Sequence, residues 1–198
     1  MKIEFKNYKD YWQEIKDCTM NTIGKSTGQY PTSEWKRKLL ISEHSPIRRL
    51  HINWRWLGLK SWISVHFVRH KIGIEHWVST QRTDRTNIDR DKLTQDSLVN
   101  HECEADAQAL INISRKRLCN CASKETREAW SMVKDKIAIK EPELASCMVR
   151  ECVYRNGLCP EMFPCGFNKT LAFEKELKDY LEIKKGDIND KTNIFKIF

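Results

Sequence analysis

The sequence lacks any long apolar run. No stretch reaches the roughly 18 consecutive apolar residues of a membrane-spanning helix, and MKIEFKNYKDYW at the amino end has no apolar core of signal-peptide length. We therefore expect an intracellular, cytoplasmic protein without a membrane partner. Internal repeats and low-complexity blocks are also missing, so the pattern favours one compact domain.

No Cys-x-x-Cys pair occurs among the eight cysteines. Without a secretory signal, free thiols or metal ligands are expected rather than disulfides. Cys147, Cys152, Cys159 and Cys165 lie near the carboxyl end, and the loop-borne Cys159 and Cys165 could bind zinc. Cys147 and Cys152 are expected to be helical and not on one face. We expect buried thiols, with a zinc-stabilised loop as the alternative.

The basic residues form no tail. Lysine and arginine number 35 against 27 acidic residues, a net charge of +8, and they are scattered along the chain. This balance favours anionic partners, and the scatter favours a phosphate pocket over a nucleic-acid track. A solvated basic surface is the ordinary explanation for most of them.

The apolar spacing predicts an α+β domain over residues 1–185, followed by a tail over 186–198. "LHINWRW" alternates apolar and polar residues, which predicts a half-buried strand. Strands are expected over 1–7 and 50–56. Helices are expected over 8–19, 32–44, 59–73, 101–122, 123–139, 142–152 and 170–185.

Three short motifs could bind an anion. "RHK" at Arg69–Lys71 places consecutive cations near a helix end, and "VSTQR" at Val78–Arg82 combines hydroxyls with an arginine. Arg117 lies at the edge of a buried helix face and needs an anionic partner. Each motif also has an ordinary explanation. The helix dipole favours cations such as "RHK" near a helix carboxyl end. "VSTQR" could be a polar edge strand, and Arg117 could form a salt bridge with Asp106 or Glu125.

Taken in order, the motifs resemble the flavin-dependent thymidylate synthase family. The segments are "EHSPI", "FVRHKIG" followed by "STQR", "LINISRKRLCNCASKETR" and "CPEMFPCG". The resemblance covers roughly Leu39 to Phe167. It implies the thymidylate synthase-complementing fold, a central, mostly antiparallel sheet flanked by helices.

The resemblance also implies an activity. Family members convert dUMP to dTMP by reductive methylation, taking the methylene group from methylenetetrahydrofolate. FAD is the hydride carrier and NADPH the reductant. Family members are homotetramers whose sites combine several subunits, so a homotetramer is expected here.

Site residues follow from the same resemblance. Flavin contacts are implied for Ser45, Arg69, His70, Lys71 and Asn112. Nucleotide contacts are implied for His66, Arg69, Ser79, Thr80, Gln81, Arg82, Arg90 and Arg117. The spacing after "RHK" leaves two registers open, because Ser79 fits a seven-residue gap whereas Thr80 and Arg82 fit an eight-residue gap. Arg117 is the implied catalytic residue, since a fixed guanidinium would stabilise negative charge developing on the uracil ring.

Several positions depart from the family pattern. Lys71 replaces an arginine, Arg48 stands where glutamate is usual, and only seven residues separate Arg82 from Arg90. The chain is therefore expected to be a divergent, compact member, a form that would suit a viral or phage source. Two alternatives stay open: an enzyme making another C5-modified pyrimidine nucleotide, and an inactive nucleotide- or nucleic-acid-binding module.

Overall fold

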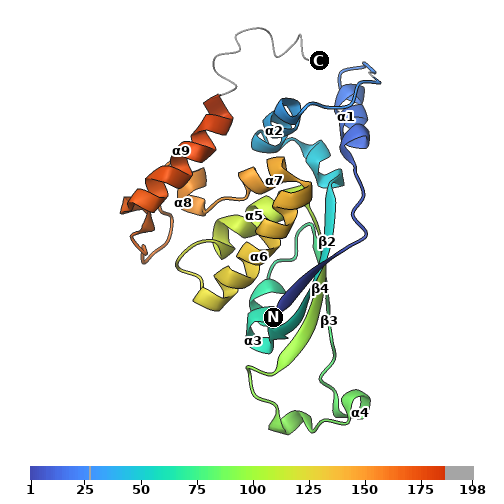
Figure 1. The fold of residues 1–198 in the computed structure, drawn as a ribbon, viewed down its shortest axis with the longest axis vertical. Helices are drawn as coiled ribbons and strands as arrows, with labels where there is room; N and C mark the ends of the chain where they lie inside the picture. The colour runs from blue at the N-terminus through green and yellow to red at the C-terminus, as the bar shows by residue number, and fades with distance from the viewer. Residues whose placement is uncertain (27, 186–198) are drawn as a thin grey trace.

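A four-stranded antiparallel sheet forms the centre of the molecule, in the order β1-β2-β4-β3 (Figure 1). The computed structural model describes residues 1–26 and 28–185, so the expected tail over 186–198 lies outside the described residues. The strands are β1 (Lys2–Lys6), β2 (His51–Lys60), β3 (Ile74–Val78) and β4 (Leu98–Asp106). This sheet, flanked by helices, confirms the α+β prediction.

The helices gather on one side of the sheet (Figure 1). None of the described helices is long and apolar enough to cross a membrane. The α-helices are α1 (Trp12–Asn21), α2 (Ser33–Ile41), α3 (Ser61–Phe67), α4 (Thr83–Thr86), α5 (Ala107–Arg117), α6 (Lys124–Lys140), α7 (Pro142–Cys147), α8 (Glu151–Tyr154) and α9 (Leu171–Lys185). The short 3-10 helices are η1 (Ser45–Arg49), η2 (Arg90–Lys92) and η3 (Phe167–Lys169).

Tryptophans fill the space between the sheet and the helices. Trp54 and Trp56 come from the inward face of β2, as the alternation predicts, and both are fully buried. Trp130 of α6 meets Trp54 edge-on with ring centroids 5.8 Å apart. Phe67, at the end of α3, stacks on Trp56 at 4.6 Å. The same tryptophan core therefore fixes α3 and α6 against the sheet.

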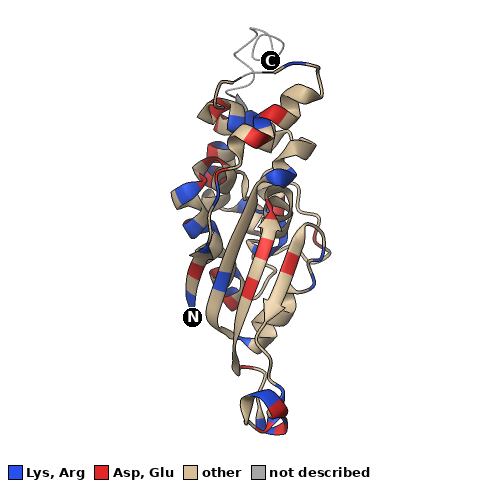
Figure 2. Cartoon of the chain, turned by 90° about the vertical axis from the view of Figure 1, so that its right-hand side faces the viewer, with Lys and Arg blue, Asp and Glu red and all other residues tan. Residues whose placement is uncertain are grey.

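Charged residues alternate with others along the strands, as the blue and red bands on the ribbon in Figure 2 show, and they face away from the tryptophan core. Arg55 of β2 pairs with Glu102 of β4, and its Nε donates over 2.6 Å. His51 lies 3.3 Å from Glu104 in a diagonal contact, since its register partner on β4 is Asp106. Cross-strand pairs of this kind hold the register of a solvent-facing surface.

The prediction of a helix over 101–122 is wrong at both ends. Residues 101–106 belong to β4, which pairs with β2 on one side and β3 on the other. Helix α5 begins only at Ala107, where the Asp106 carboxylate accepts from the backbone N–H of Ala109 at 2.7 Å. It ends at Arg117, and residues 118–122 turn away toward α6.

The region predicted as a helix over 59–73 divides into three parts. Strand β2 continues to Lys60 through an irregularity at Gly58, whose φ of +68° suits glycine. Helix α3 begins at Ser61 and ends at Phe67. Gly73, expected as the helix stop, instead forms the turn into β3 with a φ of +69°.

Other boundaries shift by smaller amounts. Helix α1 begins at Trp12 rather than near Tyr8, because Asp10 accepts from the Trp12 backbone N–H at 2.9 Å. The predicted helix over 142–152 breaks into α7 and α8, since Met148 and Arg150 leave the helical backbone region. The strand at the amino end, the Thr32 cap of α2 and the Ser123 cap of α6 are confirmed.

Candidate functional site

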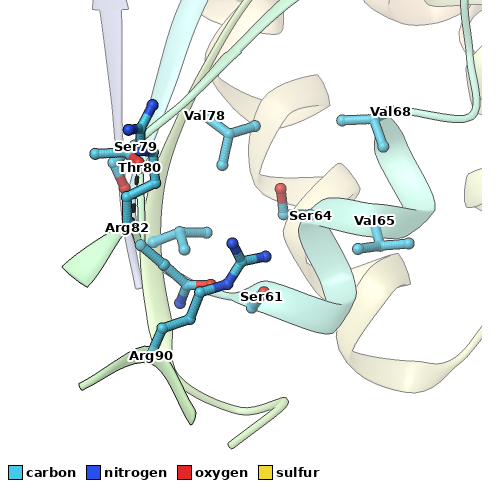
Figure 3. A pocket seen from close by; sticks show the side chains of 11 residues that line it. Ser61, Ser64, Val65, Val68, Val78, Ser79, Thr80, Arg82 and Arg90 are labelled. Atoms are coloured by element: carbon cyan, nitrogen blue, oxygen red, sulfur yellow. Dashed lines mark hydrogen bonds between the residues drawn. The ribbon is translucent and has the colours of Figure 1, made fainter. Parts of the chain in front are cut away.

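A hollow of about 320 Å³ opens between α3 and the end of β3 (Figure 3). It lies directly after the edge strand of the sheet, where the chain leaves β3 for the α4 turn. Residues from α3, β3, β4 and the turn line it: Ser61, Ser64, Val65, Val68, Val78, Ser79, Thr80, Gln81, Arg82, Arg90 and Val99. Valines make part of the lining apolar, and hydroxyl groups, an amide and two arginines make the rest polar.

Arg90 brings an unpaired positive charge to this hollow. Its backbone N–H donates to Thr83 Oγ1 at 3.1 Å, which anchors η2 to the start of α4. The guanidinium extends toward Ser61 of α3 (Figure 3). Within residues 1–26 and 28–185, no carboxylate pairs with it, whereas Arg82 is held by Asp84 through two hydrogen bonds. An anionic ligand would complete the coordination of Arg90.

Five residues that the sequence assigned to the nucleotide therefore share one hollow: Ser79, Thr80, Gln81, Arg82 and Arg90. Ser79 is fixed by a reciprocal pair with Asn100, donating its backbone N–H to the carbonyl at 2.8 Å and accepting at Oγ from the backbone N–H at 2.9 Å. Sequence reasoning missed the wall formed by α3. The signal was present, because Ser61, Ser64, Val65 and Val68 follow helical spacing.

Arg117 forms a second centre with the "RHK" segment. Its Nε donates to His70 Nε2 at 2.8 Å, and its Nη2 donates to the backbone carbonyl of His66 at 2.7 Å. Neither Asp106 nor Glu125 pairs with it, and no other described carboxylate does. The alternative of an ordinary salt bridge is therefore wrong. Arg117 is a half-buried cation held by neutral groups.

Burial and positive neighbours set the charge states here. Burial, with Arg117 and His76 nearby, lowers the pKa of His70 to about 4. The pKa of His66 is lowered by burial and by Arg117 and Arg69. The pKa of Arg117 is lowered by burial and by Arg69, yet an arginine stays charged at neutral pH. At pH 7 the two histidines are neutral, and the centre offers cations to an anion.

A chain of hydrogen bonds joins the hollow to His70. The carbonyl of His70 can only accept, so His76 carries its proton on Nε2, 2.9 Å away. His76 Nδ1 then accepts from His101 Nε2 at 3.0 Å, and His101 Nδ1 accepts from Ser64 Oγ at 3.0 Å. The thiol of Cys103 lies 3.3 Å from His76 Nδ1. These partners were missed because β4 was read as a helix.

The remaining predicted residues lie apart from these contacts. His66 turns its ring toward α6, where Nδ1 lies 3.1 Å from Thr126 Oγ1, and only its carbonyl touches Arg117. Arg69 and Lys71 are exposed, and neither pairs with a carboxylate of the described chain.

The two other predicted flavin residues lie near Glu43. Asn112 accepts from Arg115 Nη1 at 3.1 Å, and Arg115 also pairs with Glu43. Ser45 begins η1, two residues after Glu43, and is exposed. No described contact joins Ser45 or Asn112 to the hollow or to Arg117.

The expectation of buried thiols is confirmed for Cys147 and Cys152 but wrong for Cys159, which is half-exposed, and for Cys165, which is exposed. Cys147 is buried in the main core and belongs to no thiol cluster of the described residues. Cys119 and Cys121, which follow α5, lie beside Cys165 instead. All eight thiols are free.

The fold is that of the flavin-dependent thymidylate synthases. ThyX from Helicobacter pylori, crystallised with FAD and dUMP, superposes with a TM-score of 0.62 over 76% of this chain and all of that chain, at 13% identity. A second H. pylori ThyX structure with the same ligands gives 0.61 at 15% identity, over 75% of this chain and 99% of that one. PolB from Streptomyces cacaoi, a UMP/dUMP methylase bound with 5-Br dUMP, gives 0.59 at 12% identity, over 74% and 93%.

At such identities the comparison establishes the fold alone. No protein-family profile matches the chain, and no curated protein sequence matches it.

Proposed function

We propose that the chain is a flavin-dependent thymidylate synthase, converting dUMP to dTMP with methylenetetrahydrofolate, FAD and NADPH. The observation that carries the proposal is the 2.8 Å contact between Arg117 and His70. These residues are 47 positions apart in sequence, and the family resemblance assigned both to one site. Two residues of one site must lie close together, and these two do. The fold is also consistent with the family that the resemblance named.

The hollow beside α3 suits the nucleotide phosphate. Arg90 supplies an unpaired guanidinium, while Ser79 and Thr80 supply hydroxyl groups. Arginine binds phosphate through parallel hydrogen bonds, and hydroxyl groups complete such a site without adding negative charge. The apolar wall of Val65 and Val68 leaves room beside the phosphate for a pyrimidine ring.

Arg117 would stabilise the reacting ring. Methyl transfer requires C5 of uracil to become electron-rich, so negative charge builds on the ring oxygens. A guanidinium fixed by His70 and the His66 carbonyl can meet that charge without first reorganising. Because His70 is neutral at pH 7, it accepts from Arg117 and leaves the positive charge on the guanidinium.

The chain also offers residues suited to FAD. Arg69 and Lys71 are exposed cations without carboxylate partners among the described residues, so they could bind the pyrophosphate, and Ser45 and Asn112 could contact the rest of the flavin. When bound, reduced FAD supplies the hydride that completes the methyl group. We further propose that residues 1–185 form one domain and that four chains assemble, combining these groups.

Visible absorption spectroscopy tests the proposal. A flavin spectrum that shifts on adding dUMP, followed by dTMP formation, is the expected result. Arg90→Gln should weaken dUMP binding roughly tenfold or more, since a charge-assisted hydrogen bond is lost. Arg85→Gln is the matched control, because Arg85 is exposed in the same turn and does not line the hollow. Absence of flavin binding under all conditions would overturn the proposal.

A second candidate is an enzyme that makes another C5-modified pyrimidine nucleotide. The short connection from Arg82 to Arg90 favours it, because only the single turn of α4 and the start of η2 stand there, a departure from the family pattern beside the nucleotide segment. Lys71 is a second departure, because its ammonium group cannot make the two parallel hydrogen bonds of the arginine guanidinium that the family pattern has there. The mass of the product separates this candidate from dTMP synthesis. A nucleic-acid-binding module would instead show affinity that rises with DNA length and falls steeply with salt.

A further inference from the structure

Three cysteine sulfurs converge where α5 ends. The Sγ atoms of Cys119, Cys121 and Cys165 all lie within 4.8 Å of one another. Cys119 and Cys121 follow α5 directly, whereas Cys165 comes from the segment between α8 and α9. The Cys121 thiol also lies 3.7 Å from the Phe163 carbonyl, 42 residues away in sequence, so the end of α5 and the segment before α9 meet here.

A fourth thiol borders the same place. A small void of about 10 Å³ adjoins this trio and is lined by Cys119, Cys152, Cys159 and Cys165, while Cys121 lies outside its lining. Cys159 lies on the segment that carries Cys165 and is half-exposed, so its side chain can turn. Cys152 lies within α8, packed into the small core that includes Val153.

The middle of the segment over 155–170 has little apolar packing to hold it, whereas Phe167 near its end packs against the small core of α8 and α9. Leu158, Met162 and Phe163 are exposed by 64%, 90% and 87%. One surface ion pair, Lys116 to Glu161 at 3.0 Å, ties it to α5, and such pairs contribute little. Thiols are weak hydrogen-bond donors and acceptors, so a cluster of protonated cysteines adds little more.

We propose that Cys119, Cys121, Cys159 and Cys165 bind one zinc ion. Zinc favours four thiolates in a tetrahedron with bonds of about 2.3 Å, which sets sulfurs about 3.8 Å apart. Three sulfurs already lie within reach of that spacing. Binding displaces one proton from each thiol, four in all, and joins the 155–170 segment to the end of α5. With four protein ligands the site is closed, and the ion is structural.

The sequence pattern concealed this site. The ligands form Cys-x-Cys after a helix and a loop pair with five residues between its members, so no Cys-x-x-Cys signal exists. The proposal is independent of the enzymatic one, because zinc content is measured without any turnover. A structural zinc is compatible with every function considered above.

Zinc content of the full chain is the first test. The protein is purified under reducing conditions with zinc chloride and freed of excess metal. The ratio of zinc to protein is then measured by elemental mass spectrometry. About one zinc per chain is expected. Cys165→Ser and Cys159→Ser should lose it to the level of the buffer, whereas Cys18→Ser, a half-buried thiol of α1, should keep it. Zinc retained by either ligand variant would overturn the assignment.

Cobalt gives a test that does not depend on folded variants. Cobalt(II) added to the metal-free chain should produce the intense visible bands of tetrahedral thiolate coordination, and zinc should abolish them. Failure of the reduced chain to bind either metal would overturn the proposal. So would a disulfide among these cysteines under reducing conditions, seen as a lowered intact mass.

Discussion

Neutral histidines shape the charge of the candidate site at the scale of single residues. His70 accepts from Arg117 and His101 donates to His76, so each ring is used in its uncharged form. Protonation of His70 would place a second cation against a guanidinium 2.8 Å away. Burial and this repulsion lower the pKa of His70 to about 4, and burial beside His76 does the same for His101.

Stability should therefore fall as the pH falls from 6.5 to 4. In that window the unfolded chain protonates both histidines while the folded chain does not, so the unfolded state binds more protons. Each histidine contributes a slope of about 1.4 kcal/mol per pH unit, and below pH 4 the slope disappears. Urea unfolding at several pH values measures how the free energy of unfolding changes with pH. His101→Gln, which retains a donor and an acceptor, should flatten the curve by one such slope; an unchanged curve would contradict the assigned pKa of His101.

Arg117→Lys should reduce turnover by about a hundredfold or more, because lysine has no fork to bridge His70 and the His66 carbonyl. Affinity for dUMP should change less than the rate constant. Arg127→Lys is the matched control, since Arg127 also donates to backbone carbonyls, at 2.6 Å to Ala122, but lies away from the hollow. Steady-state kinetics of both variants measures the rate constant and the dependence on dUMP. Full activity of Arg117→Lys would show that Arg117 is not a catalytic residue.

At the scale of elements, sequence patterns identified the strands and helices that follow simple apolar periods. "LHINWRW" alternates tryptophans and polar residues, and β2 is there. Strand β4 was missed because two of its inward positions hold His101 and Cys103, which do not read as apolar. Their burial depends on partners from α3 and β3, including Ser64 and His76, and such tertiary contacts cannot be seen in a local window.

In the candidate site, too, sequence motifs predicted some residues, whereas others depend on tertiary contacts. The family motifs predicted the substrate segment, and its members Ser79 to Arg82 do share a hollow with Arg90. The resemblance assigned Arg117 to the nucleotide and His70 to the flavin, and the structure places the two side chains in direct contact. The α3 wall was not predicted, because helical spacing shows which residues share a face but not that this face lies opposite the end of β3.

Gly73 couples two elements of the site. The "RHK" segment runs along α5, with His70 meeting Arg117 at one end and the Gly73 carbonyl accepting from the Asp106 N–H at the other. A Cβ on Gly73 would lie 2.6 Å from Asp106 Oδ2, and the φ of +69° is strained for other residues. Asp106 cannot withdraw without uncapping α5.

Gly73→Ala should therefore lower the free energy of unfolding by about 2 kcal/mol, from backbone strain together with a weakened cap. Gly28→Ala is the matched control, because its Cβ would meet open space at an ordinary φ. Chemical denaturation of both variants provides the comparison. Equal stability of the two would show that the turn adapts freely.

At the scale of the whole molecule, the proposed ligand residues fall into separate regions of one chain. Arg90 and Arg82 line the hollow, whereas Asn112 is held by Arg115 on the part of α5 near Glu43. If both regions serve one active site, the simplest arrangement is that different subunits supply them. The expected homotetramer offers such an arrangement, and native mass spectrometry should give four chains.

Mixing inactive variants tests whether subunits share a site. Assayed at dUMP and FAD concentrations well below saturation, Arg90→Gln and Asn112→Ala should each lose most of the activity alone. Co-expressed in equal amounts, they should recover roughly a quarter of wild-type activity, because one site in four would pair an intact Arg90 with an intact Asn112 from another subunit. Arg90→Gln mixed with Arg82→Gln is the control: both residues line one hollow of one chain, so no mixed site regains both. Recovery in neither mixture would mean that each chain builds its site alone, and the separation of Asn112 from the hollow would then require movement within one subunit.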